Sequence, residues 1–441
     1  MRGELFLPIF CPDRLLEATG DGAWIAAFGE AEAALARAEG ELGLIPDSLA
    51  EEIASAAQAG TFDPAELGRA ARASANPVIP FVASVRASLA KPASDYVHFG
   101  ATSQDILDTA AALIATRACA LVDDYLIALL RALARIAAEH AETPMAGRTL
   151  MQHAAPTTFG MKVAGWISAL VEAGFNLRSS TAALSASLGG AAGTLAAWGE
   201  RGPELQEHFA DRLGLATPAM SWHTNRVRVA TLGSSLAILA GAAAKVATDV
   251  IILSQDELAE VAEGVPGGSS AMPNKHNPAG AIRVVAAARQ CVGLASTLTS
   301  SMVQENERAA GAWQAEWQAL SDLLALAGGA VAALGEVAEG LRVDKVRIGT
   351  NLDLTKGALL AERANYALIA ALGRDAAQAA LARAAAHSAG FAQGLREDEE
   401  VLGALGEVTI AELLQPSGYL GASTLYTRRA LAMAQIYEKE R

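Results

Sequence analysis

Between Gly100 and Pro144 the chain contains neither glycine nor proline. Apolar residues recur within this stretch at three- and four-residue steps, from Ile106 through Leu113 to Leu133. That spacing is the period of an α-helix, sustained for about ten turns. A helix of this length is stable only when other long helices pack along it. The stretch therefore restricts the chain to folds built around a bundle of long helices.

Three further stretches have the same helical pattern, at about 157–187, 226–261 and 278–341. Glycine and proline are more frequent near both ends, so shorter helices are expected there. Aromatic residues make up only 5% of a chain that is 52% hydrophobic, which favours closely packed helices over a β-sandwich. We predict an all-α fold with three helical domains. They are a small N-terminal domain (1–104), a central bundle of long helices (105–350) and a small C-terminal domain (351–441).

The charge balance of 34 − 48 = −14 argues against nucleic acid as a partner. Cys11, Cys119 and Cys291 lack metal-ligand spacing, which indicates a reducing compartment and no disulfide framework. The first residues lack the apolar stretch of a signal peptide, and the uncharged runs fall short of a membrane span. We expect a cytoplasmic protein with no membrane partner. Because the central helices are apolar on more than one face, we also expect an oligomer.

Residues 263–280 interrupt the helical pattern with four glycines and three prolines. Most glycine-rich polar loops are solvated connections. This one also contains two serines, Lys275 and His276, which are groups suited to proton transfer and anion binding. We predict a mobile loop that brings a hydroxyl and a cation to a substrate.

A second polar cluster lies at the start of the long helix, from His98 to Asp105. Gly100 allows the chain to turn, and Thr102 or Ser103 can cap the following helix. The same hydroxyls, with free N–H groups at a helix N-terminus, can instead bind a carboxylate. Both interpretations remain open for this segment.

Three other clusters are candidates for anion binding or proton transfer. Residues 148–153 place an arginine, a glutamine and a histidine on a short irregular or helical segment. His223 and Arg226 form either a surface turn beside a buried tryptophan or an anion site. Arg308 either pairs with Glu305 or faces a substrate.

Residues 268–278 have the sequence Gly-Ser-Ser-Ala-Met-Pro-Asn-Lys-His-Asn-Pro. It resembles the signature Gly-Ser-Ser-x-Met-Pro-x-Lys-x-Asn-Pro of the fumarase/aspartase superfamily at every fixed position. The segments near 98–109 and 147–160 resemble the other two homologous regions of that superfamily in order and spacing. The resemblance covers essentially the whole chain.

One departure from the superfamily pattern distinguishes its branches. Superfamily lyases usually carry Thr-His-x-Gln in the second region, whereas this chain has Leu150 at the histidine position. His153 follows three residues later, which on a helix is nearly the same face. The cycloisomerase branch has a similar arrangement. Adenylosuccinate lyase, which shares the Pro-Thr-Thr-Phe-Gly turn, is the alternative, and a non-catalytic helical oligomer is a third hypothesis.

The resemblance implies an intramolecular lyase of aromatic catabolism that closes a lactone ring in a small tricarboxylate. It also implies a homotetramer whose active sites are shared between subunits, with no metal and no organic cofactor. Lys275 and Asn277 are the candidates for holding developing negative charge. Ser269 and His153 are alternative candidates for proton transfer. The candidates for binding substrate carboxylates are His98, Thr102, Ser103, Arg148, Gln152, Ser270 and Arg308.

Overall fold

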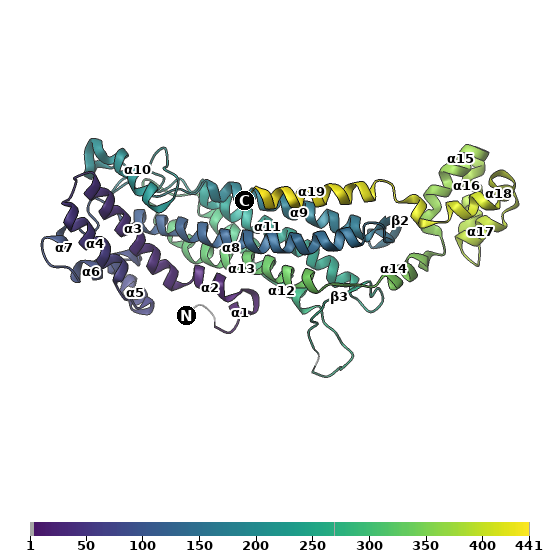
Figure 1. The fold of residues 1–441 in the computed structure, drawn as a ribbon, viewed down its shortest axis with the longest axis horizontal. Helices are drawn as coiled ribbons and strands as arrows, with labels where there is room; N and C mark the ends of the chain where they lie inside the picture. Colours follow the sequence, from purple (N-terminus) through teal and green to yellow (C-terminus); the bar gives the residue numbers. More distant parts are fainter. Residues whose placement is uncertain (1–3, 269, 441) are drawn as a thin grey trace. The chain divides into compact units, whose positions relative to one another are not determined.

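Helices make up most of the structure, a computed structural model that describes residues 4–268 and 270–440 (Figure 1). The strands within these ranges form two antiparallel pairs, β1 with β2 and β3 with β4. The predicted all-α fold is confirmed, because these short strands only connect helices.

The long helix expected after Gly100 is α8 (Ser103–Glu139), which contains 37 residues. Ile106, Leu113 and Leu133 are all buried in it, as the helical spacing predicts. The other long helices are α9 (Phe159–Ala182), α11 (Val227–Leu253), α12 (Ala279–Ser300) and α13 (Ala312–Gly340).

The expectation of one continuous helix across 278–341 was wrong, because residues 301–311 form a loop between α12 and α13. Asn306 and Gly311 have φ angles of 52° and 118°, which interrupt a right-handed helix. The carboxylate of Glu305 accepts a hydrogen bond from a backbone N–H of the loop at 2.7 Å. The loop thus replaces some of the hydrogen bonds that a continuous helix would have made.

The chain folds into two compact units, each made of segments that are distant in sequence. The three-domain division at residues 104 and 350 describes consecutive segments and stays a prediction. Unit 1 comprises the described residues up to Leu126, Glu172–Ala244 and Arg283–Ala333, and unit 2 comprises Ile127–Val171, Lys245–Ile282 and the described residues from Leu334 onward.

Unit 1 contains helices that precede α8 and two that lie between α9 and α11. Among them α3 packs against α4 and α10. These elements are α1 (Leu7–Phe10), α2 (Asp13–Thr19), α3 (Asp21–Glu41), α4 (Asp47–Ala59), α5 (Pro64–Ala70), η1 (Ala71–Ala73), α6 (Val78–Ala87), α7 (Ala93–Tyr96), η2 (Ala196–Arg201) and α10 (Gly202–Leu213).

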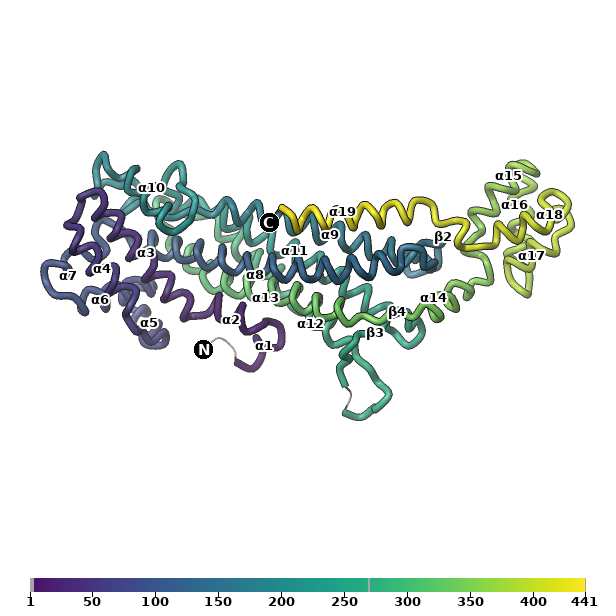
Figure 2. Tube along the Cα trace, viewed as in Figure 1, coloured from purple at the N-terminus to yellow at the C-terminus, as the bar shows by residue number. Residues whose placement is uncertain are grey.

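Unit 2 contains both strand pairs and the C-terminal helices. Figure 2 shows the chain between β3 and α12 leaving the helices as a long open loop. The pairs are β1 (Pro144–Thr149) with β2 (Gln152–Thr158), and β3 (Val261–Ala262) with β4 (Arg342–Val343). The remaining elements are α14 (Lys345–Leu352), η3 (Asp353–Thr355), η4 (Ala358–Leu360), α15 (Ala361–Leu372), α16 (Arg374–Ala386), α17 (Phe391–Glu397), α18 (Glu399–Leu413), η5 (Pro416–Tyr419) and α19 (Ser423–Lys439).

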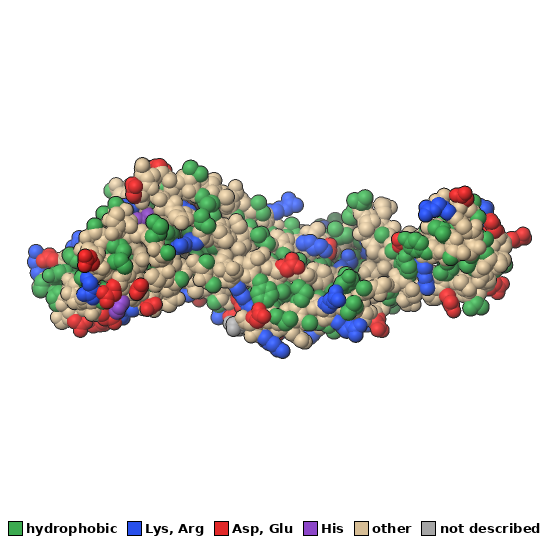
Figure 3. Space-filling model, turned by 90° about the horizontal axis from the view of Figure 1, so that it is seen from above, with side chains coloured by type: hydrophobic (Ala, Val, Ile, Leu, Met, Phe, Trp, Pro, Cys, Tyr) green, Lys and Arg blue, Asp and Glu red, His purple; other side chains and the backbone are tan. Residues whose placement is uncertain are grey.

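Three long helices, α11, α12 and α13, are apolar enough to cross a membrane by length and composition alone. The most apolar stretch of α13 is 83% buried, but those of α11 and α12 are only 44% and 39% buried. Val227, Ile238 and Val292 are among the exposed side chains. On the face drawn in Figure 3, apolar side chains lie in groups between charged ones. A single chain therefore leaves apolar helix surface uncovered.

Helices α15 to α18 share a hydrophobic core of their own, in which Leu368 is fully buried. Replacing Leu368 with alanine should lower the free energy of unfolding by about 2–5 kcal/mol, because the deleted atoms leave a cavity. Val408 on α18 is 74% exposed, so Val408→Ala is the matched control and should change stability by about 0.5 kcal/mol or less. Urea denaturation followed by circular dichroism measures both. Equal effects of the two substitutions would contradict this account of the core.

Candidate active site

The loop before α8 turns sharply in unit 1. His98 and Gly100 have φ angles of 61° and 69°. A Cβ atom on Gly100 would lie 2.6 Å from the ring of Trp198, so only glycine fits there. The turn places His98, Thr102 and Ser103 close together at the helix N-terminus.

Asp105 caps α8 and ties two other loops to it. Its carboxylate accepts hydrogen bonds from the backbone N–H of Thr102 at 3.0 Å and from those of Gly189 and Gly190, both at 2.9 Å. His223 Nε2 lies 2.6 Å from the same carboxylate. Asp105 is fully buried, so these contacts replace the water that a carboxylate needs. The cap expected from Thr102 or Ser103 is supplied by Asp105, and the Ser103 hydroxyl accepts a hydrogen bond from Asn76 at 2.8 Å.

Arg308 lies against the start of α8. Its Nε donates to Gln104 Oε1 at 3.1 Å, and a terminal nitrogen donates to the carbonyl of Ala191 at 3.2 Å. The alternative pairing with Glu305 is wrong, since Glu305 caps the 301–311 loop instead. The Gln104 amide nitrogen donates to Asp108 at 3.1 Å, which links Arg308 to the buried core of unit 1. This arrangement keeps a cation beside the carboxylate-binding candidates.

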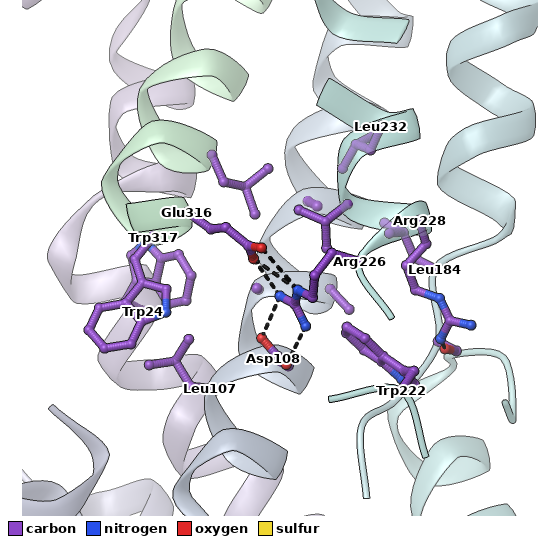
Figure 4. Close-up of a pocket in the computed structure, with 16 residues that line it drawn as sticks. Trp24, Leu107, Asp108, Leu184, Trp222, Arg226, Arg228, Leu232, Glu316 and Trp317 are labelled. Carbon is purple, nitrogen blue, oxygen red and sulfur yellow. Dashed lines mark hydrogen bonds and ion pairs between the residues drawn. The ribbon is translucent and has the colours of Figure 1, made fainter. Parts of the chain in front are cut away.

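Arg226 is not an anion site, which corrects one of the two interpretations made from sequence. Figure 4 shows its guanidinium between the carboxylates of Asp108 and Glu316. The closest contacts are 2.7 Å to Asp108 and 2.5 Å to Glu316, and all three side chains are buried. Trp222 stacks at 5.0 Å on the guanidinium, and the narrow cavity beside the triad is lined largely by apolar side chains. The charge of Arg226 is therefore compensated by two carboxylates inside the protein.

Two carboxylates share this one cation, and one of them, Glu316, has a shifted pKa. Burial raises the pKa of Glu316 to about 7, although the hydrogen bonds from Arg226 oppose the shift and the charge of Asp108 adds to it. A protonated Glu316 makes the triad neutral overall, which lowers the cost of burying it.

The second candidate segment, in unit 2, is a β-hairpin and not the irregular or helical segment expected. Leu150 and Met151 form its turn with φ angles of 49° and 65°, and both side chains are exposed. Arg148 lies opposite His153 in the register, and Thr149 lies opposite Gln152. The helical spacing inferred between Leu150 and His153 therefore does not apply. Arg148 and His153 instead lie on one face of the hairpin because they are cross-strand partners.

Arg148 is held by a buried carboxylate. Its two terminal nitrogens donate to Glu260 at 3.0 and 2.5 Å, and Asn351 donates to the same carboxylate at 2.9 Å. Burial lowers the pKa of His153, and the nearby charge of Arg148 lowers it further. His153 Nδ1 is buried and makes no hydrogen bond to the described residues. A neutral imidazole can accept a proton. Gln152, the residue before His153, is exposed.

The signature loop, residues 263–280, is held by hydrogen bonds at its base, and its described residues farther along are mostly exposed. Gly267 and Asn277 exchange backbone hydrogen bonds of 2.8 and 2.9 Å. The Glu263 carboxylate accepts from the first N–H groups of α12, at 3.0 and 2.7 Å. Ser270 and Lys275 are exposed, and the Asn277 amide donates to the Gly268 carbonyl at 3.3 Å. Ser269, the other proton-transfer candidate, lies outside the described residues.

The candidate groups thus form one set in unit 1 and another in unit 2. In unit 1 His98, Thr102, Ser103 and Arg308 offer donors to an anion. In unit 2 His153 offers a base and Lys275 a cation. Within residues 4–268 and 270–440 no group of three His, Cys, Asp or Glu side chains has the arrangement of a metal site. The groups of unit 1 suit the binding of a carboxylate, and those of unit 2 suit acid–base chemistry.

Sequence reasoning missed the buried acidic side chains that hold these groups. Glu32, Asp108 and Glu316 had one visible signal, which is a charged residue among the apolar residues of a helix; such residues are almost never buried unless paired. Asp105 stands in the polar cluster at the start of α8 without an assigned role, and Glu260 lies in a loop without such a signal. The missed residues are Glu32, Asp105, Asp108, Glu260 and Glu316.

Comparison with known proteins gives consistent similarities. Residues 17–293 match the model of a family described as lyase. The nitrosuccinate lyase of Streptomyces davaonensis is 43% identical, over 97% of this chain and 94% of its own. The 3-carboxy-cis,cis-muconate cycloisomerase of Bradyrhizobium diazoefficiens is 42% identical, over 91% of each chain. Among solved structures, the 3-carboxy-cis,cis-muconate lactonizing enzyme from Pseudomonas putida matches with a TM-score of 0.93 and 37% identity, over 99% of this chain and 100% of its own.

Replacing Glu316 with glutamine should change how stability depends on pH. The folded-state pKa of Glu316, about 7, lies above its ordinary value of 4.5, so the folded protein binds the extra proton between these values. Stability from this group is therefore present at low pH and lost as pH rises through about 7. We expect the wild type to lose on the order of 1–3 kcal/mol relative to Glu316→Gln between pH 5 and pH 8. Urea denaturation at both pH values measures this, with Glu307→Gln as the control because Glu307 is exposed. Parallel pH profiles of stability in the wild type and in Glu316→Gln would contradict it.

Proposed function

This chain belongs to the lyase family within the fumarase/aspartase superfamily, and from that membership we propose that it interconverts 3-carboxy-cis,cis-muconate and 4-carboxymuconolactone. The observation that carries the proposal is the match to the Pseudomonas putida lactonizing enzyme along 99% of this chain at 37% identity. An intramolecular lyase of this kind serves aromatic catabolism.

The proposed reaction adds one substrate carboxylate across a conjugated double bond and closes a five-membered lactone. A proton is delivered to the neighbouring carbon. The reverse reaction is an elimination in which a carboxylate is the leaving group, so a lyase scaffold suits an isomerase. The intermediate carries extra negative charge on carboxylate oxygens, which positioned donors must stabilise; one good donor is worth about 3 kcal/mol.

The substrate brings three carboxylates to a protein of net charge −14, so its binding needs local cations and donors. Lys275 and Asn277 are assigned the role of stabilising the developing negative charge. Arg308, held by Gln104, and the half-buried Thr102 and Ser103 support the assignment of carboxylate anchors. The other assigned anchors are His98, Arg148, Gln152 and Ser270, although the terminal nitrogens of Arg148 are engaged by Glu260.

Ser269 and His153 remain the two candidates for transferring the proton. The lowered pKa of His153 supports a base, because it favours the neutral imidazole. In the forward direction the same group, once protonated, would act as the acid. An unassisted serine is a poor acid or base near neutral pH, so Ser269 would need a tuned environment.

The proposal includes a cytoplasmic homotetramer with active sites shared between subunits. The exposed apolar faces of α11 and α12 support it, because subunits of a shared bundle would bury Val227, Ile238, Ile282 and Val292. The same burial would account for helices apolar enough for a membrane in a protein that works in water.

A second function, elimination from nitrosuccinate, is favoured by one observation. The nitrosuccinate lyase of Streptomyces davaonensis is 43% identical to this chain and aligns with 97% of it. The chemistry is also β-elimination next to a carboxylate, with nitrite as the leaving group and fumarate as the product. The signature loop would serve either substrate.

The deciding experiment is an ultraviolet assay of the purified protein with 3-carboxy-cis,cis-muconate in the presence of a chelator. We expect the diene absorbance to fall as the lactone forms. If it does not fall, and fumarate is released from nitrosuccinate or from adenylosuccinate, the superfamily chemistry stands and the proposed substrate is wrong.

Replacing Lys275 with methionine should lower kcat about 10²- to 10³-fold, because a donor to the developing charge is lost. His276 is the next residue, is also exposed, and carries no assigned role. His276→Ala is therefore the matched control and should keep kcat within a few-fold. Similar losses in both variants would indicate that the loop conformation, and not the ammonium group, is what matters.

Replacing Ser269 and His153 separately with alanine should identify the proton-transfer group. We expect one of the two variants to lose kcat by about 10²-fold or more, since general acid–base catalysis contributes about 10²–10⁴-fold. Rates measured from pH 5 to pH 9 would show whether the change in rate caused by titration of His153 disappears in the His153 variant. If both variants turn over at near wild-type rates, both assignments are wrong.

A further inference from the structure

Helix α3 carries two buried glutamates, Glu32 and Glu39, in a run of small apolar residues. Each is only 1% exposed. They are two helical turns apart and so lie on the same face. Both contact the segments that shape the loop before α8, and the proposed mechanism uses neither of them.

Glu32 contacts the ring of His98. The distance from Glu32 Oε1 to His98 Nδ1 is 2.5 Å, while the second carboxylate oxygen is buried with no hydrogen bond to the described residues. A buried carboxylate with one partner depends on that partner for its charge compensation. Because Glu32 occupies Nδ1, only Nε2 of His98 is left to bind a ligand.

The charges around His98 favour its protonated form. Burial, the largest single cause, lowers the pKa of His98, but the charge and hydrogen bond of Glu32 together with the charge of Asp105 on α8 raise it above its ordinary value. Arg86 on α6 opposes them, and its guanidinium also donates to the Val97 carbonyl at 3.0 Å. The surroundings thus favour the imidazolium over the neutral ring in the loop that carries Thr102 and Ser103.

We propose that Glu32 is a positioning residue that holds His98 as an imidazolium and aims Nε2 at a substrate carboxylate. Its partner on the ligand side is a carboxylate bound beside Thr102 and Ser103, so the inference rests on the proposed function for its ligand class. A charge-assisted contact from His98 adds a cation to the site without exposing another basic side chain.

Glu39 contacts the same region but differs in charge. Its carboxyl group accepts a hydrogen bond from Trp198 Nε1 at 2.8 Å, and Trp198 packs against Gly100. Burial raises the pKa of Glu39 to about 8, despite the Trp198 hydrogen bond, and the charge of Glu32 adds to the shift. Glu39 is therefore largely neutral near pH 7, and glutamine imitates it closely. Glu39→Gln is the matched control for Glu32→Gln.

The test measures the titration of His98 directly in the full-length protein. Hydrogen–deuterium exchange at imidazole Cε1, followed by mass spectrometry from pH 5 to pH 9, gives the pKa of an individual histidine. We expect Glu32→Gln to lower the pKa of His98 by one unit or more, Glu39→Gln to leave it within about 0.3 unit, and Glu32→Asp to restore part of the shift. An unchanged pKa in Glu32→Gln overturns the inference. If Glu32→Gln does not fold, the Asp variant must still show a pKa between the ordinary value and that of the wild type.

Substrate affinity supplies the second readout. KM should rise about tenfold in Glu32→Gln at pH 7.5, while kcat stays within threefold. As pH rises, substrate affinity should fall at a lower pH in this variant than in the wild type. Tricarballylate, a simple tricarboxylate, tests binding by calorimetry when no substrate is turned over. A shifted His98 pKa with unchanged KM and unchanged tricarballylate affinity would overturn the anchoring role. Because the exchange measurement needs no substrate, failure of the proposed function is distinguishable from failure of this inference.

Discussion

The buried positive charge of Arg226 organises unit 1. A guanidinium can be buried only where carboxylates surround it, and here Asp108 and Glu316 do so from two different long helices. The salt bridges therefore fix α8 and α13 relative to the start of α11. Trp313 adds a 3.0 Å hydrogen bond to Asp108, and Gln304 adds one of 3.1 Å to Glu316. Removing the cation would leave the buried acidic groups of Asp108 and Glu316 without a positive charge beside them, so the surrounding helices depend on it.

The same network extends from the core to the candidate site. Asp108 accepts a hydrogen bond from Gln104, and Gln104 in turn accepts one from Arg308. Asp105, the residue after Gln104 on α8, holds the backbone of Gly189 and the ring of His223. A rigid interior therefore sets the direction of the groups that would meet an anion. Preorganisation of this kind lets donors act on developing charge without reorganising first.

Much of the helical architecture was predictable from sequence, but the contacts between distant residues were not. The absence of glycine and proline after Gly100 predicted α8, because local propensity and period agree there. The triad was missed because Arg226 lies 118 residues from Asp108 and 90 from Glu316, so no local pattern pairs them. The hairpin at 144–158 was missed because Leu150 and Met151 are not usual turn residues. The roles assigned to Ser269 and Lys275 rest on the family signature and stay predictions.

The tip of the β1–β2 hairpin has a consequence for how such a protein can diverge. Leu150, which the family resemblance aligns with the usual histidine, is 97% exposed and contributes almost nothing to the core. Its left-handed backbone is unfavourable for leucine, and histidine tolerates this conformation better. Exchanging one for the other therefore costs little folding free energy. Natural selection can change the chemistry offered at this position without a second, compensating mutation elsewhere in the fold.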